Sequence, residues 1–372
     1  MHRVSISSTG LYIPPFVISN EELVAAFNSF ATLDNTAHAV EIAEGSKQAI
    51  PMSSVEFIEK ASGIKQRYVK EKSGVLDPQR MRPRLPTRPD TEISLMAEIG
   101  VAAAKDALTR AGKRAQDIDG VICACANMQR AYPAMAIEIQ TALGIKGFGF
   151  DMNVACSSAT FGIEMAVNTV KSGAARAVLV ISPEITSPHL AWKDRDCHFI
   201  FGDVCTAVLV ERLENAQTGS FEVLSTRLLT TFSNNIRNNA GYMSRSEDRN
   251  PEDRDQLFYQ EGRKVFKEVC PMAAEHMNQH LAAHGLSAAD VRRFWLHQAN
   301  LGMNQLIARK LLGRDATPDD APVILDEFAN TASAGSIIAF HRHHADFLPG
   351  DVGMICSFGA GYSIGSAVVR RL

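Results

Sequence analysis

Hydrophobic and polar residues follow two different periods along the chain. Short runs that are apolar almost throughout, at residues 174–182 and 204–210, are typical of strands buried on both faces. Longer segments with apolar residues every three or four positions, at 91–111 and 161–172, predict amphipathic helices. Because such strands and helices alternate, we expect an α/β fold whose sheets are mixed, mostly parallel and covered by helices.

The N-terminal part of the chain adds less regular segments. Residues 4–11 predict a first strand, and Ser19 and Glu22 predict the capped start of a helix. Residues 31–53 are polar, rich in Ala and weakly helical, which indicates an insertion lying over the core. Residues 73–90 are rich in Pro and Arg and form either a solvated loop or a docking patch for an acidic partner.

Two segments of the chain repeat one pattern. Asp117–Asn127 and Asp290–Asn300 both run from an Asp through an apolar strand to Ala-Asn, without a gap between them when aligned, and a helical pattern ending in Leu-Gly follows each. An internal repeat of this length predicts duplicated, superposable α/β halves. The polar turn at 214–220 is the best candidate boundary, so we expect halves of residues 1–213 and 214–372.

Composition and charge exclude several classes of protein. A chain of 372 residues with 46% hydrophobic residues can bury two domains or one large duplicated core. Its net charge of −3 gives no reason to expect nucleic acid or a membrane surface as partner, and no apolar run reaches membrane-spanning length. The seven cysteines are odd in number and scattered, and residues 1–6 read as a strand rather than a leader, which together favour a reducing cytoplasm.

Cys156 is the first candidate for chemistry. It lies between a predicted strand and a predicted helix, where unpaired N–H groups and the positive helix end stabilise a thiolate. Its small neighbours, including Ala155 and Ser157, would let a substrate carbonyl approach closely. We therefore interpret Cys156 as a nucleophile; the alternative is a buried, inert cysteine, the commonest fate of a free thiol.

Three further segments offer polar groups that could act with Cys156. His297 follows a strand at 294–296, at the end where α/β folds place functional groups, or it is a satisfied core histidine. Asn330 stands in a turn of small residues before a helix, where it acts in a site or caps the helix. Residues 357–365 form a Gly-rich turn between two strands; the spacing fails the dinucleotide fingerprint, and its N–H groups would suit an oxyanion.

With these segments in view, the chain resembles the β-ketoacyl-ACP synthase III family. Four motifs match that family in order: Ala-Cys-Ser-Ser at Cys156, His-Gln-Ala-Asn at His297, Ala-Asn-Thr-Ala-Ser-Ala at Asn330, and the Phe-Gly-Ala-Gly loop. Together with the Ile-Phe-Gly-Asp segment at 200–203, the ordered set is highly specific and spans nearly the whole chain. The resemblance implies the thiolase fold, with two similar halves in a five-layered αβαβα sandwich, and a homodimer.

The resemblance also implies a reaction. Cys156 would attack an acyl thioester while the N–H groups of Cys156 and Gly361 hold the oxyanion. His297 and Asn330 would donate hydrogen bonds to the thioester carbonyl of malonyl-ACP as CO₂ leaves, and the resulting carbanion would attack acyl-Cys156. The product would be a β-ketoacyl-ACP of fatty acid biosynthesis, made by an acyltransferase that uses no cofactor and no metal.

Four positions are implied to contact substrate. Phe57 and Arg195 match positions that contact CoA in the family, and Asn300 closes the His-Gln-Ala-Asn motif. Tyr132 matches a residue that the partner subunit inserts into the acyl pocket. The implied partners are therefore an acyl-CoA, malonyl-ACP and a second copy of the chain.

Departures from the family pattern bear on the primer. Ala61 and Gly302 stand where family members that use acetyl-CoA often have Arg, and the insertions at 31–53 and 73–90 are absent from the short-chain members. This pattern resembles the longer-primer branch, such as the β-ketodecanoyl-ACP synthases that condense octanoyl-CoA with malonyl-ACP.

Two other functions remain open from the sequence. One is a thiolase-fold acyltransferase or non-decarboxylative condensing enzyme of secondary metabolism, and the other is a non-catalytic acyl-carrier-binding protein. The intact set of Cys156, His297 and Asn330 argues against both. His276, His280 and His284 recur every four residues on a predicted helix, where we weigh a shared metal against a solvated helix face and prefer the latter.

Overall fold

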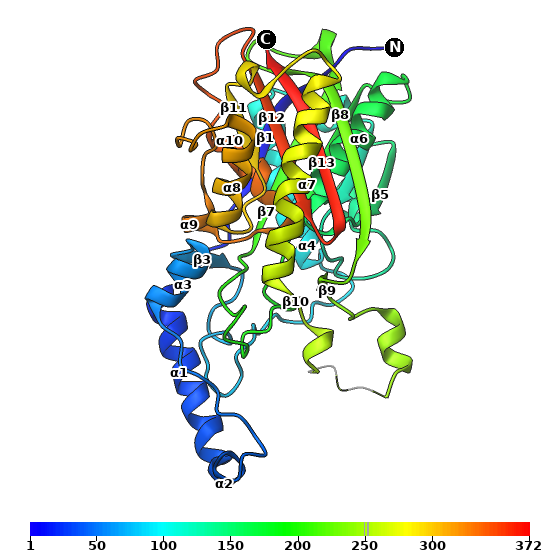
Figure 1. The fold of residues 1–372 in the computed structure, drawn as a ribbon. Coiled ribbons are helices and arrows are strands. Elements are labelled where there is room, and N and C mark those ends of the chain that lie inside the picture. Colours follow the sequence, from blue (N-terminus) through cyan, green and yellow to red (C-terminus); the bar gives the residue numbers. More distant parts are fainter. Residues whose placement is uncertain (249, 251–252) are drawn as a thin grey trace.

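The computed structural model describes residues 1–248, 250 and 253–372 (Figure 1). One sheet runs through the molecule in the order β11-β12-β13-β8-β1-β7-β6-β4-β5. The strands on one side of it are β1 (Val4–Tyr12), β4 (Gly120–Ala124), β5 (Phe148–Met152), β6 (Ala177–Glu184) and β7 (Val204–Arg212). Those on the other side are β8 (Phe221–Ser233), β11 (Arg293–Leu296), β12 (Val352–Gly359) and β13 (Gly361–Arg371).

Helices cover both parts of this sheet and fill the space between them. The principal ones are α4 (Leu95–Arg110), α5 (Met135–Leu143), α6 (Ser158–Lys171), α7 (Gly262–Ala282), α8 (Leu301–Leu312) and α10 (Gly335–Arg342). In the middle, α6 and α10 contact strands of both parts, while α4 and α5 lie on one outer face and α7 and α8 on the other. Figure 1 shows α7 lying across β13 and β8. These five layers confirm the predicted αβαβα sandwich.

The internal repeat has a structural counterpart. A 3-10 turn precedes β4 at Ala115–Asp117 and β11 at Ala288–Asp290, and the Asp carboxylate of each turn accepts a backbone N–H three residues earlier. The helices that follow, α5 and α8, both end at a left-handed glycine, Gly144 (φ 72°) and Gly313 (φ 69°). Because β1 and β8 are neighbours, the strands before the 214–220 turn occupy one side of the sheet and those after it the other.

The prediction of mostly parallel sheets is wrong. Among the described strands, β4 pairs in parallel with β5 and β6, and β11 with β12. The other pairings of the large sheet are antiparallel. Parallel neighbours need a helical crossover, but the segment at 185–203 that joins β6 to β7 contains no helix, and only Ala360 separates β12 from β13.

The insertion at 31–53 does not lie over the core as predicted. It belongs to an arm of α1 (Asn20–Ala37) and α2 (Ala39–Ala43), which extends away from the sheet in Figure 1. The first turns of α1 bury Leu23 and Phe27, but the helix is longer than the surface it covers, so Leu33 is 53% exposed. The predicted Ser19–Glu22 capping box is confirmed.

The remaining elements connect the arm and the long loops to this body. They are β2 (Phe16–Ser19), α3 (Val55–Ser62), β3 (Gln66–Val69), β9 (Ile236–Arg237), β10 (Tyr259–Gln260) and α9 (Leu325–Phe328). In the loop at 73–90, Arg84 forms an ion pair with Asp77 and Arg88 with Glu98. These two guanidinium groups therefore pair within the chain, which favours the surface loop over the docking patch. No helix among the described residues is long and apolar enough to cross a membrane.

Candidate active site

Cys156 lies in a 3-10 turn, Ala155–Ser157, between β5 and α6. The turn is held by Asn153, whose Oδ1 accepts the Ala155 N–H at 2.8 Å, and by Ser158, whose Oγ accepts the Val154 N–H at 2.8 Å. Ala155 has a φ of 47°, in the left-handed region that costs a residue with a side chain about 1 kcal/mol or more. The fold therefore stabilises a strained turn to bring the sulfur to the start of a helix.

The predicted Gly-rich turn between two strands is confirmed at β12 and β13, and it contacts Cys156 directly. A Cβ on Gly359 would lie 2.5 Å from the Cys156 Cβ, so only glycine permits this approach. The backbone N–H groups of Cys156 and Ala360 both act to lower the pKa of the Cys156 thiol. The family resemblance implies Gly361 as the source of the second N–H, and that stays a prediction; the N–H that lowers the pKa of Cys156 is that of Ala360, one residue earlier.

The thiol is not poised as a thiolate, contrary to the sequence-based expectation. Burial raises the pKa of Cys156 to about 12, the negative charge of Glu184 adds to the rise, and the two backbone N–H groups oppose it. Desolvation therefore outweighs the helix end and the amides. At neutral pH the free enzyme holds a protonated Cys156.

His297 follows β11 directly, as predicted. Its backbone N–H donates to the Cys356 carbonyl at 2.8 Å, and its ring lies edge-on to Phe358 with the centroids 5.2 Å apart. Burial lowers the pKa of His297 to about 4, so the imidazole is neutral at physiological pH. Its Nδ1 is buried without a hydrogen-bond partner among the described residues, and the residue lines the cavity described below.

Asn330 lies in the turn between α9 and α10. Its backbone bonds to Ile200 and Gly202, and its side-chain Oδ1 accepts the Ala332 N–H at 2.9 Å. Because the oxygen is used within the turn, the NH₂ group is the part of the amide left for a ligand; no protein partner for it is found within the described residues. The flanking Ala329 (φ 57°) and Ala332 (φ 49°) are both left-handed, as Ala155 is.

A cavity of about 820 Å³ brings these three side chains together. Cys156, His297 and Asn330 all line it, and Phe57 and Asn300 line it as well. The cavity is bounded by elements from both sides of the sheet. The three predicted catalytic residues thus line one cavity although they are far apart in the sequence.

The other predicted substrate-binding residues have separate places. The Arg195 guanidinium lies 3.7 Å from the centroid of Phe57, and its Nε donates to the Met52 carbonyl at 2.7 Å. Asn300 caps α8 through Oδ1, and its Nδ2 donates to the Ala61 carbonyl at 2.6 Å. Phe57 lies on the cavity wall and the Arg195 guanidinium stacks on it without lining the cavity, whereas both polar groups of Asn300 are used within the protein.

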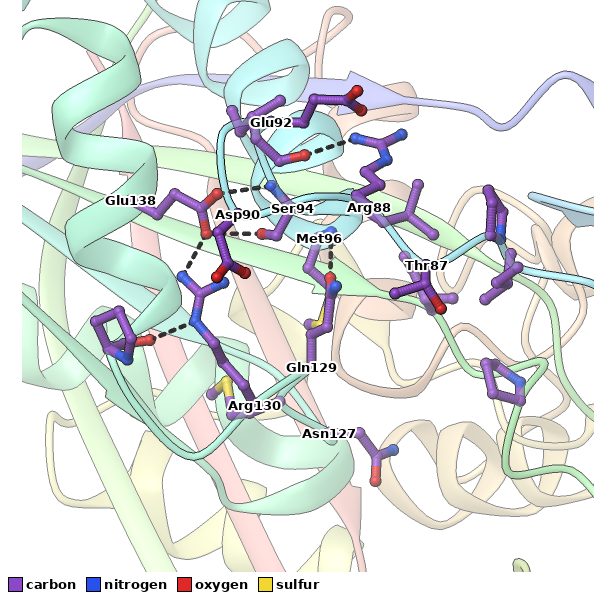
Figure 2. A pocket seen from close by; sticks show the side chains of 18 of the residues that line it. Thr87, Arg88, Asp90, Glu92, Ser94, Met96, Asn127, Gln129, Arg130 and Glu138 are labelled. Carbon is purple, nitrogen blue, oxygen red and sulfur yellow. Dashed lines mark hydrogen bonds and ion pairs between the residues drawn. The ribbon is translucent and has the colours of Figure 1, made fainter.

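Tyr132 lies outside this cavity and is 85% exposed. It lines a second cavity, of about 1310 Å³, between the loop at 85–96 and α5 (Figure 2). Figure 2 shows that the polar groups there pair with one another: Glu138 accepts from Ser94 and from Arg130. Glu138, Ser94 and Arg130 therefore satisfy one another rather than converge on a ligand.

Three polar residues, His276, His280 and Glu184, are buried although their burial is not predicted from the sequence. His276 and His280 are buried, and the Oγ of Ser366 lies 2.9 Å from one ring and 2.7 Å from the other, so the prediction of a solvated helix face is wrong for them. Sequence reasoning also missed Glu184, a buried carboxylate at the end of β6 whose charge acts on Cys156. The sequence does contain a signal for it, because Glu184 is a single acidic residue at the end of an otherwise uncharged, mostly apolar strand.

Comparison with known proteins agrees with this site. The family model for 3-oxoacyl-[acyl-carrier-protein (ACP)] synthase III matches residues 150–230, and the model for its C-terminal part matches residues 281–371. The chain is 59% identical over 347 residues to a β-ketodecanoyl-[acyl-carrier-protein] synthase of Pseudomonas aeruginosa, covering 93% of this chain and 99% of the relative. It is 28% identical to a β-ketoacyl-[acyl-carrier-protein] synthase III of Granulibacter bethesdensis, covering 100% of both chains.

A solved structure shows the same fold. The 3-oxoacyl-[acyl-carrier-protein] synthase III of Aquifex aeolicus superposes with a TM-score of 0.77 over 99% of both chains, at 24% identity. Two family models, a relative of high identity and a cavity that joins Cys156, His297 and Asn330 all lead to one assignment. The chain belongs to the β-ketoacyl-ACP synthase III family and is a condensing acyltransferase of the thiolase fold.

Proposed function

We propose that this chain condenses a medium-chain acyl-CoA, octanoyl-CoA in the first place, with malonyl-ACP in cytoplasmic fatty acid biosynthesis. The observation that supports it most is the cavity shared by Cys156, His297 and Asn330. The primer length is supported by the relative at 59% identity, whose name gives a β-ketodecanoyl product. Condensation with malonyl-ACP adds two carbons after CO₂ leaves, so a decanoyl product requires an octanoyl primer.

In the first half-reaction, the Cys156 sulfur attacks the thioester carbonyl of the primer. The N–H groups of Cys156 and Ala360 stabilise the oxyanion, and the C–S bond to CoA breaks. The thiol proton of Cys156 ends on the departing CoA thiolate, so the acyl-enzyme forms without change of net charge.

In the second half-reaction, malonyl-ACP occupies the same cavity. His297, neutral because its pKa is about 4, and the NH₂ group of Asn330 donate hydrogen bonds to the malonyl thioester oxygen. They stabilise the enolate that forms as the carboxylate leaves as CO₂. The enolate carbon attacks acyl-Cys156, the C–S bond breaks, and the Cys156 thiolate takes up one proton.

We propose that Phe57 and Arg195 hold the CoA or carrier end of the donor at the cavity wall. The cavity also includes Lys60 and Arg263, so cationic side chains are available there for the phosphates of the donor. Asn300 acts by joining α8 to the Ala61 carbonyl across the same wall. The backbone carbonyl of Met52, in the insertion at 31–53, accepts a hydrogen bond from Arg195 and so holds that side chain in place.

We propose a homodimer in which Tyr132 of each copy reaches the acyl pocket of the other. The exposed Tyr132 supports this, and so does the unpaired edge of β5. Phe148 and Phe150 are exposed on that strand with stacked rings, as an interface strand would present them. The proposed halves, 1–213 and 214–372, contribute Cys156 and the His297–Asn330 pair respectively.

Intact-protein mass spectrometry after mixing with a ladder of acyl-CoAs tests the proposal, with Cys156→Ala beside the native protein. An adduct on the native protein alone, greatest with octanoyl-CoA, is the expected result. Malonyl-ACP should then remove the adduct while CO₂ and β-ketodecanoyl-ACP appear. Labelling that is greatest with acetyl-CoA would overturn the primer, and no labelling by any acyl-CoA would overturn CoA as the donor.

A further inference from the structure

Glu184 is a buried acid that the reaction described above does not use. It is the last residue of β6 and is 1% exposed. No cationic side chain of the described residues forms an ion pair with it. A carboxylate in such a place is costly unless hydrogen bonds compensate for the lost water.

Four contacts compensate Glu184, and they come from two turns. Its Oε1 accepts from the Ala126 N–H at 3.0 Å, the Ser333 N–H at 3.1 Å and the Ser333 Oγ at 2.5 Å. Its Oε2 accepts only a longer contact from the Ala126 N–H, at 3.2 Å. Nearly all of the bonding is therefore made by one oxygen.

Each of these turns leads to a proposed catalytic residue. On one side, the Ala126 carbonyl accepts from Asn153 Nδ2 at 2.8 Å, and Asn153 Oδ1 accepts the N–H of Ala155, the residue before Cys156. On the other side, Ser333 belongs to the turn whose Ala332 N–H donates to Asn330 Oδ1. One carboxylate thus joins the Cys156 turn to the Asn330 turn.

We propose that Glu184 is a positioning residue that fixes the Cys156 and Asn330 turns relative to each other, and that its carboxylate charge acts on the Cys156 turn, to which hydrogen bonds connect it. This rests on the condensing function proposed above. A protonated thiol is protected from alkylation and oxidation, because the thiolate is the reactive form. It also supplies the proton that the departing CoA thiolate needs.

The charges around Glu184 fit this role. The pKa of Glu184 is raised to about 7, chiefly by burial and in part by the nearby Asp203, against the hydrogen bonds from Ser333 and Ala126, which lower it. The charge of Glu184 in turn raises the thiol pKa of Cys125 and Cys205 as well as that of Cys156. Glu184 is therefore ionised above neutral pH, where an exposed thiol would begin to lose its proton.

Glu184→Gln separates charge from position. With its amide oxygen in the place of Oε1, Gln keeps the three shorter contacts and loses only the one at 3.2 Å. Glu184→Ala removes charge and contacts together. Ser333→Ala removes the Oγ contact with Glu184, and the longer one with the Ala124 carbonyl at 3.3 Å, without changing the charge. Melting temperatures show which variants fold. If Glu184→Ala does not fold, Glu184→Gln still tests the effect of the charge, and Ser333→Ala still tests the positioning of the turns.

The first readout is the pH profile of Cys156 alkylation by iodoacetamide, followed by peptide mass spectrometry. Glu184→Gln should move the midpoint of the profile to lower pH. A midpoint that is lower by about one pH unit makes alkylation about tenfold faster below both midpoints, because the thiolate fraction rises in proportion. Ser333→Ala should leave the profile unchanged. A profile of Glu184→Gln that coincides with that of the native protein would overturn the electrostatic part.

The second readout is CO₂ release from malonyl-ACP, which depends on the Asn330 turn. Glu184→Gln should stay within about threefold of the native rate, whereas Ser333→Ala should lose about threefold to tenfold and Glu184→Ala more than about tenfold. A native rate in Ser333→Ala, or in Glu184→Ala where that variant folds, would overturn the positioning part. Alkylation needs no substrate, so a failure of the condensing function would appear separately, as the absence of an acyl adduct on the native protein.

Discussion

Replacing Gly359 with Ala should abolish most acylation, because Gly359 is the point of closest approach to the nucleophile. The added Cβ would lie 2.5 Å from the Cys156 Cβ, 3.1 Å from its Sγ and 3.4 Å from its Cα. Carbon atoms in contact sit about 3.5–4.0 Å apart, so the end of β12 and the Cys156 turn must separate by about 1 Å.

A displacement of this size moves the sulfur relative to the Ala360 N–H that would hold the oxyanion. We expect the rate of acyl-Cys156 formation to fall about 10²-fold, with a loss of about 1–3 kcal/mol in the free energy of unfolding from overpacking. Rapid-quench mass spectrometry with octanoyl-CoA measures the first quantity and denaturant unfolding the second.

A matched control and a second activity make the result specific. A Cβ on Gly241 would meet nothing within 4 Å and requires no positive φ, so Gly241→Ala should acylate at the native rate. Malonyl-ACP decarboxylation should fall less than acylation in Gly359→Ala, because the three nearest atoms to the new Cβ all belong to Cys156. Native acylation in Gly359→Ala would refute the close approach and with it the reasoning on the oxyanion.

Three further predictions concern the donors, the histidines and the cavity wall. His297→Ala and Asn330→Ala should each still form acyl-Cys156 but lower CO₂ release from malonyl-ACP about 10²–10³-fold; loss of acylation in both would contradict the separation of the half-reactions. Burial lowers the pKa of His276 to about 4 and that of His280 to about 3, so the unfolded chain takes up protons first as the pH falls. Stability should therefore be full above about pH 6.5 and be lost as the pH falls toward 4, which melting curves at a series of pH values would show. His280→Gln should flatten this dependence and the exposed His284→Gln should not; equal slopes in both would count against the burial argument. Arg195→Ala should raise the KM for octanoyl-CoA about fivefold at unchanged kcat, because losing one ionic contact with the donor costs about 1 kcal/mol. Lys193→Ala, whose cation lies over Phe30, is the control, and a KM equal to the native one would remove Arg195 from donor binding.

Much of the fold and the candidate catalytic set follows from the sequence alone. The repeat of Asp117–Asn127 at Asp290–Asn300 predicts two similar halves, because a capped turn and a buried strand are local patterns that survive duplication. Cys156, His297 and Asn330 can be picked out as candidates because each stands in a short motif at the end of a strand or in a turn of small residues. The chemistry of these residue types then indicates the reaction.

Other properties were decided only when distant segments packed together. Which backbone N–H groups of the β12–β13 turn act on the Cys156 sulfur depends on how that turn meets the start of α6, and the Ala360 N–H is one that lowers the thiol pKa. The helix start predicts a thiolate, but burial and Glu184 hold the Cys156 thiol protonated. Periodicity cannot report burial by neighbours that are remote in the chain, which is why the sequence predicts a solvated face for His276 and His280.

The same physical reason explains the sheet and the arm. Strand direction depends on whether a connection contains a crossover helix, and the path of α1 beyond Phe27 depends on where the core surface ends. Local sequence determined which residues form elements, turns and reactive groups. Desolvation, strand pairing and the joining of two turns by Glu184 were decided by tertiary structure, because each is a property of atoms brought together from far apart in the sequence.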